Sequence, residues 1–258
     1  MIDFSIALEQ FEIFLLILMR IATFVYAAPF FNTTNTPQRV KIGFAFCLSL
    51  LVYPMLGQVS FEYNNIVEYA ALVVKEVVVG LMLGFVASMV VQIVQFAGKI
   101  IDMDMGLAMA TIYDPQTRNQ VGIMGNFYYY ILMLSLIVTG LYQYLVRAIV
   151  ETFTVVPLGE VKVNTTLYDT VLQFMADYMV IGFRIALPIF AAALLTNCVL
   201  GILARIAPQM NMFVIGVQLR IIGGLAVLMV IMYMFPAITN YVNGEIKQMV
   251  SMIIGGMT

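Results

Sequence analysis

The sequence contains no histidine and only two cysteines, so the side chains that most often hold zinc or haem are nearly absent. Cys47 and Cys198 stand far apart inside apolar runs, and each is interpreted first as a small buried hydrophobe. The phosphate-binding loop, serine-hydrolase and zinc-protease motifs are also missing. These absences argue against most familiar enzyme chemistries, ATP hydrolysis and standard hydrolytic reactions among them, and the chain is expected to hold no metal and no cofactor.

Charged residues are scarce as well, at 10% of the 258 residues. Twelve Lys and Arg against fourteen Asp and Glu give a net charge of −2, so the chain has no basic surface with which to bind nucleic acid. Hydrophobic residues reach 63% and the mean hydropathy is +1.01, whereas soluble domains are about 45–50% apolar. The composition is that of a membrane protein.

The first twelve residues carry three acidic side chains and no Lys or Arg, the reverse of the cationic start of a signal peptide. The first apolar segment is therefore expected to stay in the mature protein.

Long apolar segments are what the sequence does contain. A helix needs about 20 apolar residues to cross a bilayer, and five charge-free segments qualify: residues 42–61, 77–98, 119–146, 185–204 and 221–244. A sixth, 13–31, has Arg20 near its middle, and this side chain is expected to face protein or water. Because the alternation of membrane barrel strands is absent, the predicted fold class is all-α.

The expected architecture is a polytopic membrane protein of about six long apolar helices, arranged as helical hairpins in one compact unit. Pro54, Pro188 and Pro236 lie in or at the ends of these segments, where they predict kinks or breaks. Lys and Arg are divided six against five between alternate loops, which does not fix an orientation. Either the protein spans the bilayer six times with only a weak charge bias between its two sides, or some of its helical hairpins do not span a bilayer.

The connection at residues 99–124 is unusually apolar for a loop between two strong helices. Gly106 supplies a flexible point, and the pair Asp114 and Pro115 a stop. The segment folds either into a lumen as a deformable methionine-rich seal, or into an interfacial turn or ordinary core packing. The apolar residues that would form such a seal are Met103, Met105, Leu107, Met109, Ile112 and Tyr113, with Gly106 among them as the flexible point.

A second segment, residues 204–219, joins two apolar helices. Arg205 meets the negative end of a helix dipole, Pro208 suits a first helical turn and Asn211 can bond exposed backbone. Taken alone, this segment is interpreted as a well-capped helical hairpin. Gly80 and Gly84 have the spacing that lets a neighbouring helix approach closely, although such spacings are common in apolar helices.

Ionisable residues near the helix ends form candidate charge pairs. The candidates are Arg20 with Glu12, Lys99 with Asp102, and Arg184 with Asp177. Structural pairing is favoured over a proton relay, because there is no histidine and the carboxylates lie outside the charge-free segments.

Three stretches together resemble one known family, that of the R subunit of the flagellar export gate and its injectisome counterpart. The most specific is the run from Arg205 through Pro208, Gln209, Asn211 and Phe213 to Gly216. Residues 104–110 with Tyr113, Asp114 and Pro115 resemble the central loop of the family, and residues 24–39 also fit. The resemblance covers essentially the whole chain. Gln218 departs from it, because the family often has proline there.

The resemblance implies a core subunit, not an enzyme, of a type III protein export gate that passes unfolded flagellar proteins outward. It implies P-type and Q-type partner subunits and a B-type switch protein. It also implies a P-like region at residues 1–184, with a plug loop at 102–118 inside the pore, and a Q-like helical hairpin at 185–258. The expected location is the bacterial inner membrane at the flagellar basal body, partly displaced toward the periplasm. The alternative from another class is a small-solute or ion transporter or channel subunit.

Overall fold

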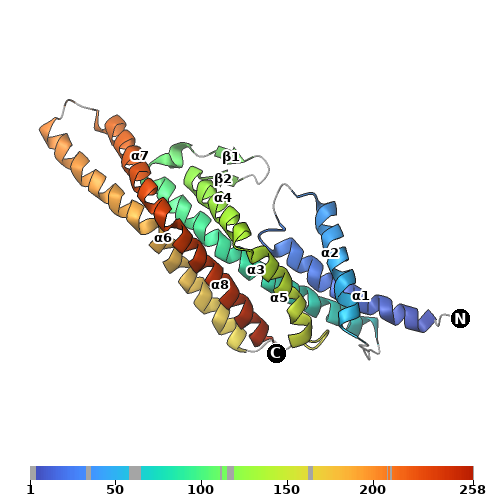
Figure 1. The fold of residues 1–258 in the computed structure, drawn as a ribbon. Coiled ribbons are helices and arrows are strands. Elements are labelled where there is room, and N and C mark those ends of the chain that lie inside the picture. The colour runs from blue at the N-terminus through green and yellow to red at the C-terminus, as the bar shows by residue number, and fades with distance from the viewer. Residues whose placement is uncertain are drawn as a thin grey trace. The chain divides into compact units, whose positions relative to one another are not determined.

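The computed structural model is built almost wholly of helices and describes residues 4–32, 36–57, 65–110, 112–114, 119–161, 165–207, 209 and 211–257 (Figure 1). Its α-helices are α1 Phe4–Ala27, α2 Gln38–Val52, α3 Ile66–Asp104, α4 Ile123–Val138, α5 Leu141–Val155, α6 Thr165–Ile206, α7 Met212–Ile231 and α8 Phe235–Gly256. Short 3-10 helices lie at Tyr53–Met55 (η1), Leu107–Ala110 (η2) and Met232–Met234 (η3). Two three-residue strands, β1 Ile112–Asp114 and β2 Asn119–Val121, pair antiparallel. The all-α prediction is confirmed.

Within the described residues, four helices are long and apolar enough to cross a membrane, or five if the broken pair α4 and α5 counts as one span. The four candidate spans are Glu9–Ala27 in α1, Ile66–Asp104 (α3), Val171–Ile206 in α6, and Val214–Gly256, which runs through α7, η3 and α8. The chain is therefore a polytopic membrane protein with fewer candidate spans than the six predicted.

The predicted span at residues 42–61 is wrong. The helix α2 ends at Val52, after 15 residues, and Tyr53–Met55 forms the 3-10 turn η1. Pro54 explains the early end, because its ring removes a backbone N–H and clashes with the preceding helical turn. A 15-residue helix is about 22 Å long, too short for the roughly 30 Å of hydrocarbon in a bilayer.

Two other predicted segments are interrupted. The segment 119–146 breaks at Gly140, whose φ of 74° is left-handed and starts α5. The segment 221–244 contains the 3-10 turn η3, directly before Phe235 and Pro236 at the start of α8. Pro188, by contrast, lies inside α6, which continues through it to Ile206.

The helices form two compact units. The first comprises residues 1–89, 140–172 and 245–258. In it α1 lies so close to α3 that a Cβ on Gly80 would come within 2.0 Å of the backbone oxygen of Arg20, and one on Gly84 within 2.7 Å of the Ala27 Cβ. These two glycines thus provide the close helix approach that their spacing predicts. On its other side α1 packs Phe14 edge-on against Phe46 of α2.

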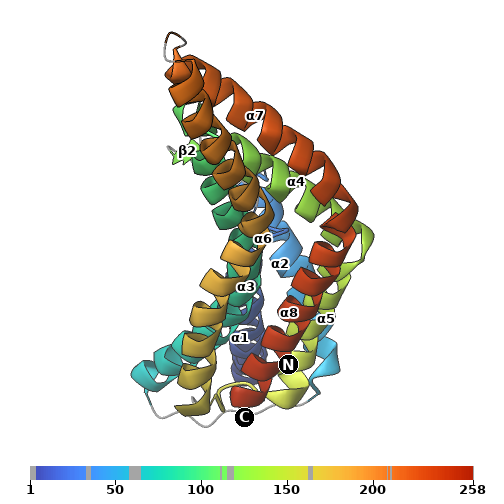
Figure 2. The ribbon, with the colours of Figure 1, turned by 90° about the vertical axis from the view of Figure 1, so that its left-hand side faces the viewer.

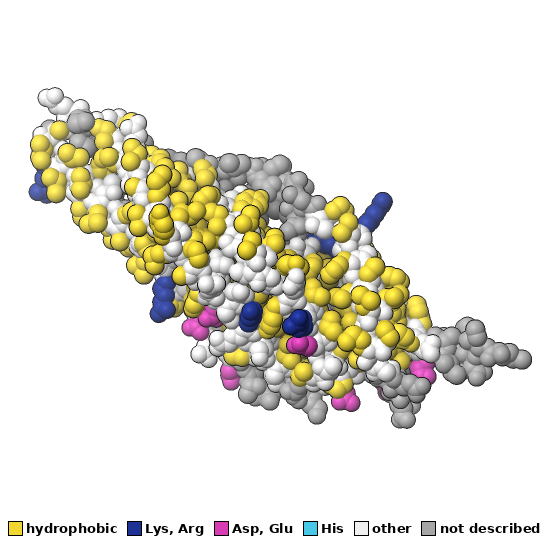
Figure 3. Space-filling model, viewed as in Figure 1, with side chains coloured by type: hydrophobic (Ala, Val, Ile, Leu, Met, Phe, Trp, Pro, Cys, Tyr) yellow, Lys and Arg dark blue, Asp and Glu magenta, His cyan; other side chains and the backbone are white. Residues whose placement is uncertain are grey.

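The second unit comprises residues 90–139 and 173–244. Here α6 and α7 meet at the turn that joins them (Figure 2). The end of α3 contacts α4 through Gly98, where a Cβ would come within 2.3 Å of the Gly125 Cα. It contacts α6 through Phe96, whose ring lies edge-on to that of Phe183. Many large apolar side chains of α6 and α7 are exposed. Figure 3 shows those on one face of the two helices.

Candidate functional site

The backbone of the central segment leaves the helical state at Gly106. Its φ of 76° is left-handed and follows directly on the end of α3, so a residue with a Cβ would be strained there. The chain then forms η2 and the β1–β2 ribbon, in which Ile112 pairs with Val121 and Tyr113 with Gln120. Irregular backbone of this kind is tolerated at membrane depth only beside protein or water. The sequence predicted a loop here and missed the ribbon, because its three-residue strands are too short to show an alternating pattern.

The side chains of this segment face different surroundings. Met105 is 1% exposed and lies against the backbone of Gly224 on α7, where a Cβ would come within 2.5 Å of the Met105 Cε. Met103, two residues earlier, is 71% exposed, and Leu107 is half-buried. Met109, Ile112 and Tyr113 are described only in their backbone, so their predicted roles lie outside the described side chains. The segment is anchored at Met105 and presents Met103 outward.

A carboxylate joins the end of α3 to the start of α4. The two oxygens of Asp102 accept hydrogen bonds from the backbone N–H groups of Met124 at 3.0 Å and Gly125 at 3.4 Å. These are donors that a helix start leaves without an internal partner. A Cβ on Gly122 would come within 1.9 Å of an Asp102 oxygen, so a larger residue there would displace this carboxylate. Asp102 thus fixes both ends of the central segment.

The Arg205 to Gly216 run forms the turn between α6 and α7. Arg205 is exposed in the last turn of α6, and Gln209 is exposed in the turn. The backbone oxygen of Asn211 accepts a hydrogen bond from the backbone N–H of Ile215. Gly216 is buried, and a Cβ there would come within 3.3 Å of Leu200 on α6. Pro208 and the side chain of Phe213 lie outside the described part. Farther along α7, Arg220 donates to Asn197 of α6 at 2.8 Å.

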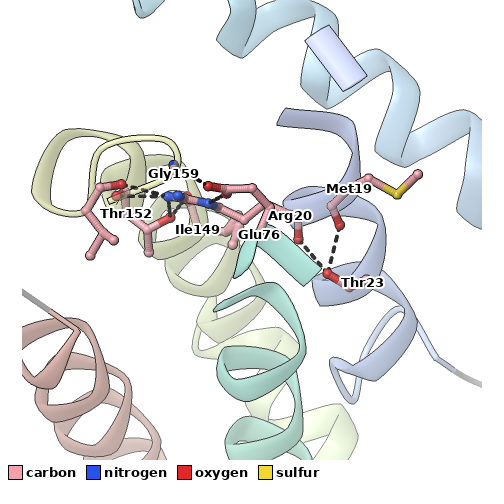
Figure 4. Close-up of polar contacts among 8 residues, drawn as sticks. Met19, Arg20, Thr23, Glu76, Ile149, Thr152 and Gly159 are labelled. Atoms are coloured by element: carbon pink, nitrogen blue, oxygen red, sulfur yellow. Dashed lines mark hydrogen bonds and ion pairs between the residues drawn. The ribbon is translucent and has the colours of Figure 1, made fainter. Parts of the chain in front are cut away.

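Arg20 and Glu76, in the first unit, are the two fully buried charged side chains among the described residues. The Arg20 side chain is 0% exposed, as the prediction that it avoids lipid requires, and its Nε forms an ion pair with Glu76 of α3 (Figure 4). Its Nη1 donates to the backbone oxygens of Val156 at 3.0 Å and of Thr152 at 3.2 Å, at the end of α5. The guanidinium also lies over the Phe153 ring, at 4.4 Å.

Glu76 completes this network, because its second oxygen accepts the backbone N–H of Gly159 at 2.8 Å. One ion pair therefore ties α1 and α3 to the end of α5 and the turn after it. Sequence reasoning paired Arg20 with Glu12, which is wrong; it treated Glu76 only as the border of an apolar segment. Arg20 and Glu76 are 56 positions apart in the sequence, which leaves no local signal for the pair.

The other two candidate charge pairs do not form within the described residues. Asp102 accepts hydrogen bonds from backbone N–H groups, as described above, and it forms no ion pair with Lys99. Arg184 and Asp177 are both exposed on α6, with no ion pair between them. Among the described side chains, no group of three or more Cys, Asp and Glu is placed to hold a metal ion.

A family model described as "Bacterial export proteins, family 1" matches residues 11–248, which include Arg20, the central segment and the α6–α7 turn. The chain belongs to this family. The match covers both compact units, and the resemblance inferred from the sequence motifs is confirmed.

Relatives of this export family protein are similar along nearly their whole length. Flagellar biosynthetic protein FliR of Bacillus subtilis (strain 168) is 32% identical over 94% of this chain and 95% of its own. The proteins of the same name from Escherichia coli (strain K12) and Aquifex aeolicus (strain VF5) are each 26% identical. Coverage is 92% of this chain and 90% of the relative for the first, and 86% of both for the second.

Proposed function

We propose that this chain is a core subunit of a flagellar type III protein export gate. The observation that carries the proposal is the family match over residues 11–248, together with relatives of near-equal length that bear the name flagellar biosynthetic protein FliR. Those names favour the flagellar system over its injectisome counterpart. The apolar helices support a place in a membrane, here the bacterial inner membrane at the flagellar basal body, partly displaced toward the periplasm in the assembly.

The subunit would assemble with P-type and Q-type subunits, contact a B-type switch protein and pass unfolded flagellar proteins. Residues 1–184 would be its P-like part and 185–258 its Q-like hairpin. The large apolar side chains exposed on α6 and α7 support such an assembly, because apolar surface of this extent is covered by lipid or by neighbouring protein. The helix α6 runs unbroken through Arg184, so the two parts would share one helix.

The central segment, residues 102–118, would be the plug of the pore. Three features support this role: non-helical backbone after Gly106, an anchor formed by Asp102 and Met105, and the exposed side chain of Met103. Methionine has a flexible, polarizable side chain and can close an irregular gap without rigid fit. The seal would block ions at rest and yield when a substrate chain enters.

Deleting the gene in its own bacterium tests the export role. The expected result is loss of flagella and of flagellar proteins from the culture medium, with both restored by a plasmid copy. If flagella persisted while uptake of a small solute failed, the transporter alternative would replace this proposal.

The plug is tested by ion leakage through the assembled gate in proteoliposomes. Deletion of residues 103–112 and the single change Met103→Gln should both raise the leak. Met229→Gln is the matched control, because Met229 on α7 is 72% exposed and lies outside the central segment. A leak that stays at the wild-type level after the deletion would contradict the plug role.

A further inference from the structure

A cavity of about 280 Å³ opens between α1, α2 and α3 within the first unit. Apolar side chains form most of its wall, among them Val25, Ile42, Ala45 and Leu81. Lys41 is the charged residue among the described residues that line the cavity. An apolar slot with a lysine at its edge fits a molecule that combines a hydrocarbon chain with an anionic head, since a lysine stem packs on apolar surface while its ammonium stays outside.

The positive charge at the start of α2 has no acidic counterpart. Arg39 and Lys41 lie in the first turn of α2, and residues 13–61 contain no Asp or Glu. Lys41 donates to the neutral side-chain oxygen of Asn32 at 2.8 Å, and neither cation forms an ion pair within the described residues. Figure 3 shows basic side chains over the start of α2 and no acidic side chain beside them on this face. The positive dipole end of α2 adds to this charge.

The cavity also lies where a membrane surface is expected. Its α1 residues, from Ala22 to Tyr26, are the last turns of the candidate span Glu9–Ala27. Tyr26 lines the cavity and is 66% exposed. Tyrosine at the end of a span, with basic residues nearby, is the arrangement found where the hydrocarbon meets the headgroups. Exposed apolar side chains of α2, such as Ile42 and Leu51, would contact the hydrocarbon of the bilayer.

We propose that this cavity binds an anionic phospholipid, with an acyl chain along Ile42 and Leu81 and the phosphate beside Arg39 and Lys41. The charge selects an anionic head over a zwitterionic one, and each cation is expected to contribute about a fivefold preference. The apolar wall selects a lipid over a free anion. The proposal requires only that the chain lies in a membrane, and it does not depend on the export role.

The absence of tryptophan makes a fluorescence test direct. Tyr26→Trp places a single reporter at the edge of the cavity, in the full-length protein reconstituted in vesicles. Phosphatidylglycerol and phosphatidylcholine with the same brominated acyl chains then quench the reporter on contact. We expect phosphatidylglycerol to reach half-maximal quenching at a several-fold lower mole fraction than phosphatidylcholine.

Two controls separate a site from general lipid contact. Tyr233→Trp places the reporter on a 92% exposed position of η3, inside a run without charged residues, and should be quenched equally by both lipids. In the Tyr26→Trp background, Arg39→Gln with Lys41→Gln should abolish the preference for phosphatidylglycerol, and Lys41→Arg should keep it. Arg147→Gln, which removes an exposed cation of α5, should leave it unchanged.

Three results would overturn the proposal. One is equal quenching of Tyr26→Trp by the two lipids, and another is a preference that survives the double Gln variant. The third is no quenching of Tyr26→Trp by either lipid in the vesicles, which would mean that no acyl chain reaches the cavity. Circular dichroism of each variant confirms that the helices are intact.

Discussion

Replacing Glu76 with glutamine should be among the most destabilising conservative changes in this chain. The Arg20 and Glu76 side chains are both fully buried, so the variant leaves a buried guanidinium without its counter-charge. The remaining acceptors of Arg20, the oxygens of Thr152 and Val156, are uncharged. Breaking a buried pair in this way costs about 3–5 kcal/mol, which for a chain of this size lowers the Tm by roughly 6–20 °C.

The assay is thermal loss of helical circular dichroism in detergent, with Asp177→Asn as the control because Asp177 is exposed on α6. The control should shift stability by less than about 0.5 kcal/mol. The double variant Arg20→Met with Glu76→Gln should recover part of the loss, since it removes the unpaired charge and leaves an amide oxygen that can accept the Gly159 N–H. A Glu76→Gln protein as stable as wild type, or a double variant that loses the sum of both single changes, would refute the reasoning.

Three further predictions concern close contacts, the first with a matched control. Gly80→Ala should destabilise the protein by about 1–3 kcal/mol in thermal unfolding, because its Cβ would come within 2.0 Å of the Arg20 backbone oxygen; Gly43→Ala, with open space around the Cβ, should stabilise by up to about 1 kcal/mol. Asp102→Ala should cost about 1–2 kcal/mol and speed amide exchange at the start of α4; unchanged exchange would contradict the capping role. Gly224→Ala should displace Met105 and raise protease sensitivity of the central segment, whereas unchanged cleavage would mean that this contact does not anchor it.

The helical fold was predictable because membrane hydrocarbon leaves the backbone few choices. The burial of Arg20 followed from the same physics, since a charge in an apolar segment must avoid lipid. The ends of the helices were less predictable. The early end of α2 depends on Pro54, and the break before α5 depends on Gly140. Both residues lie inside long apolar runs, and hydropathy alone predicts that such runs continue as one helix.

The candidate site was predictable in its position along the chain but not in its contacts. An apolar stretch of methionines between two helices marked the central segment. The anchor of Met105 on Gly224, the contact of Asp102 with α4 and the pair of Arg20 with Glu76 all join residues distant in sequence. Such contacts depend on how the helices pack, which the periodicity of one segment does not specify.

The most direct test of the proposed export role is native mass spectrometry of the protein in detergent, expressed alone and together with the neighbouring genes for P-type and Q-type subunits. The account predicts a discrete hetero-oligomer that contains this chain with both partners. A stable homo-oligomer that forms equally well in the presence of those partners would contradict it.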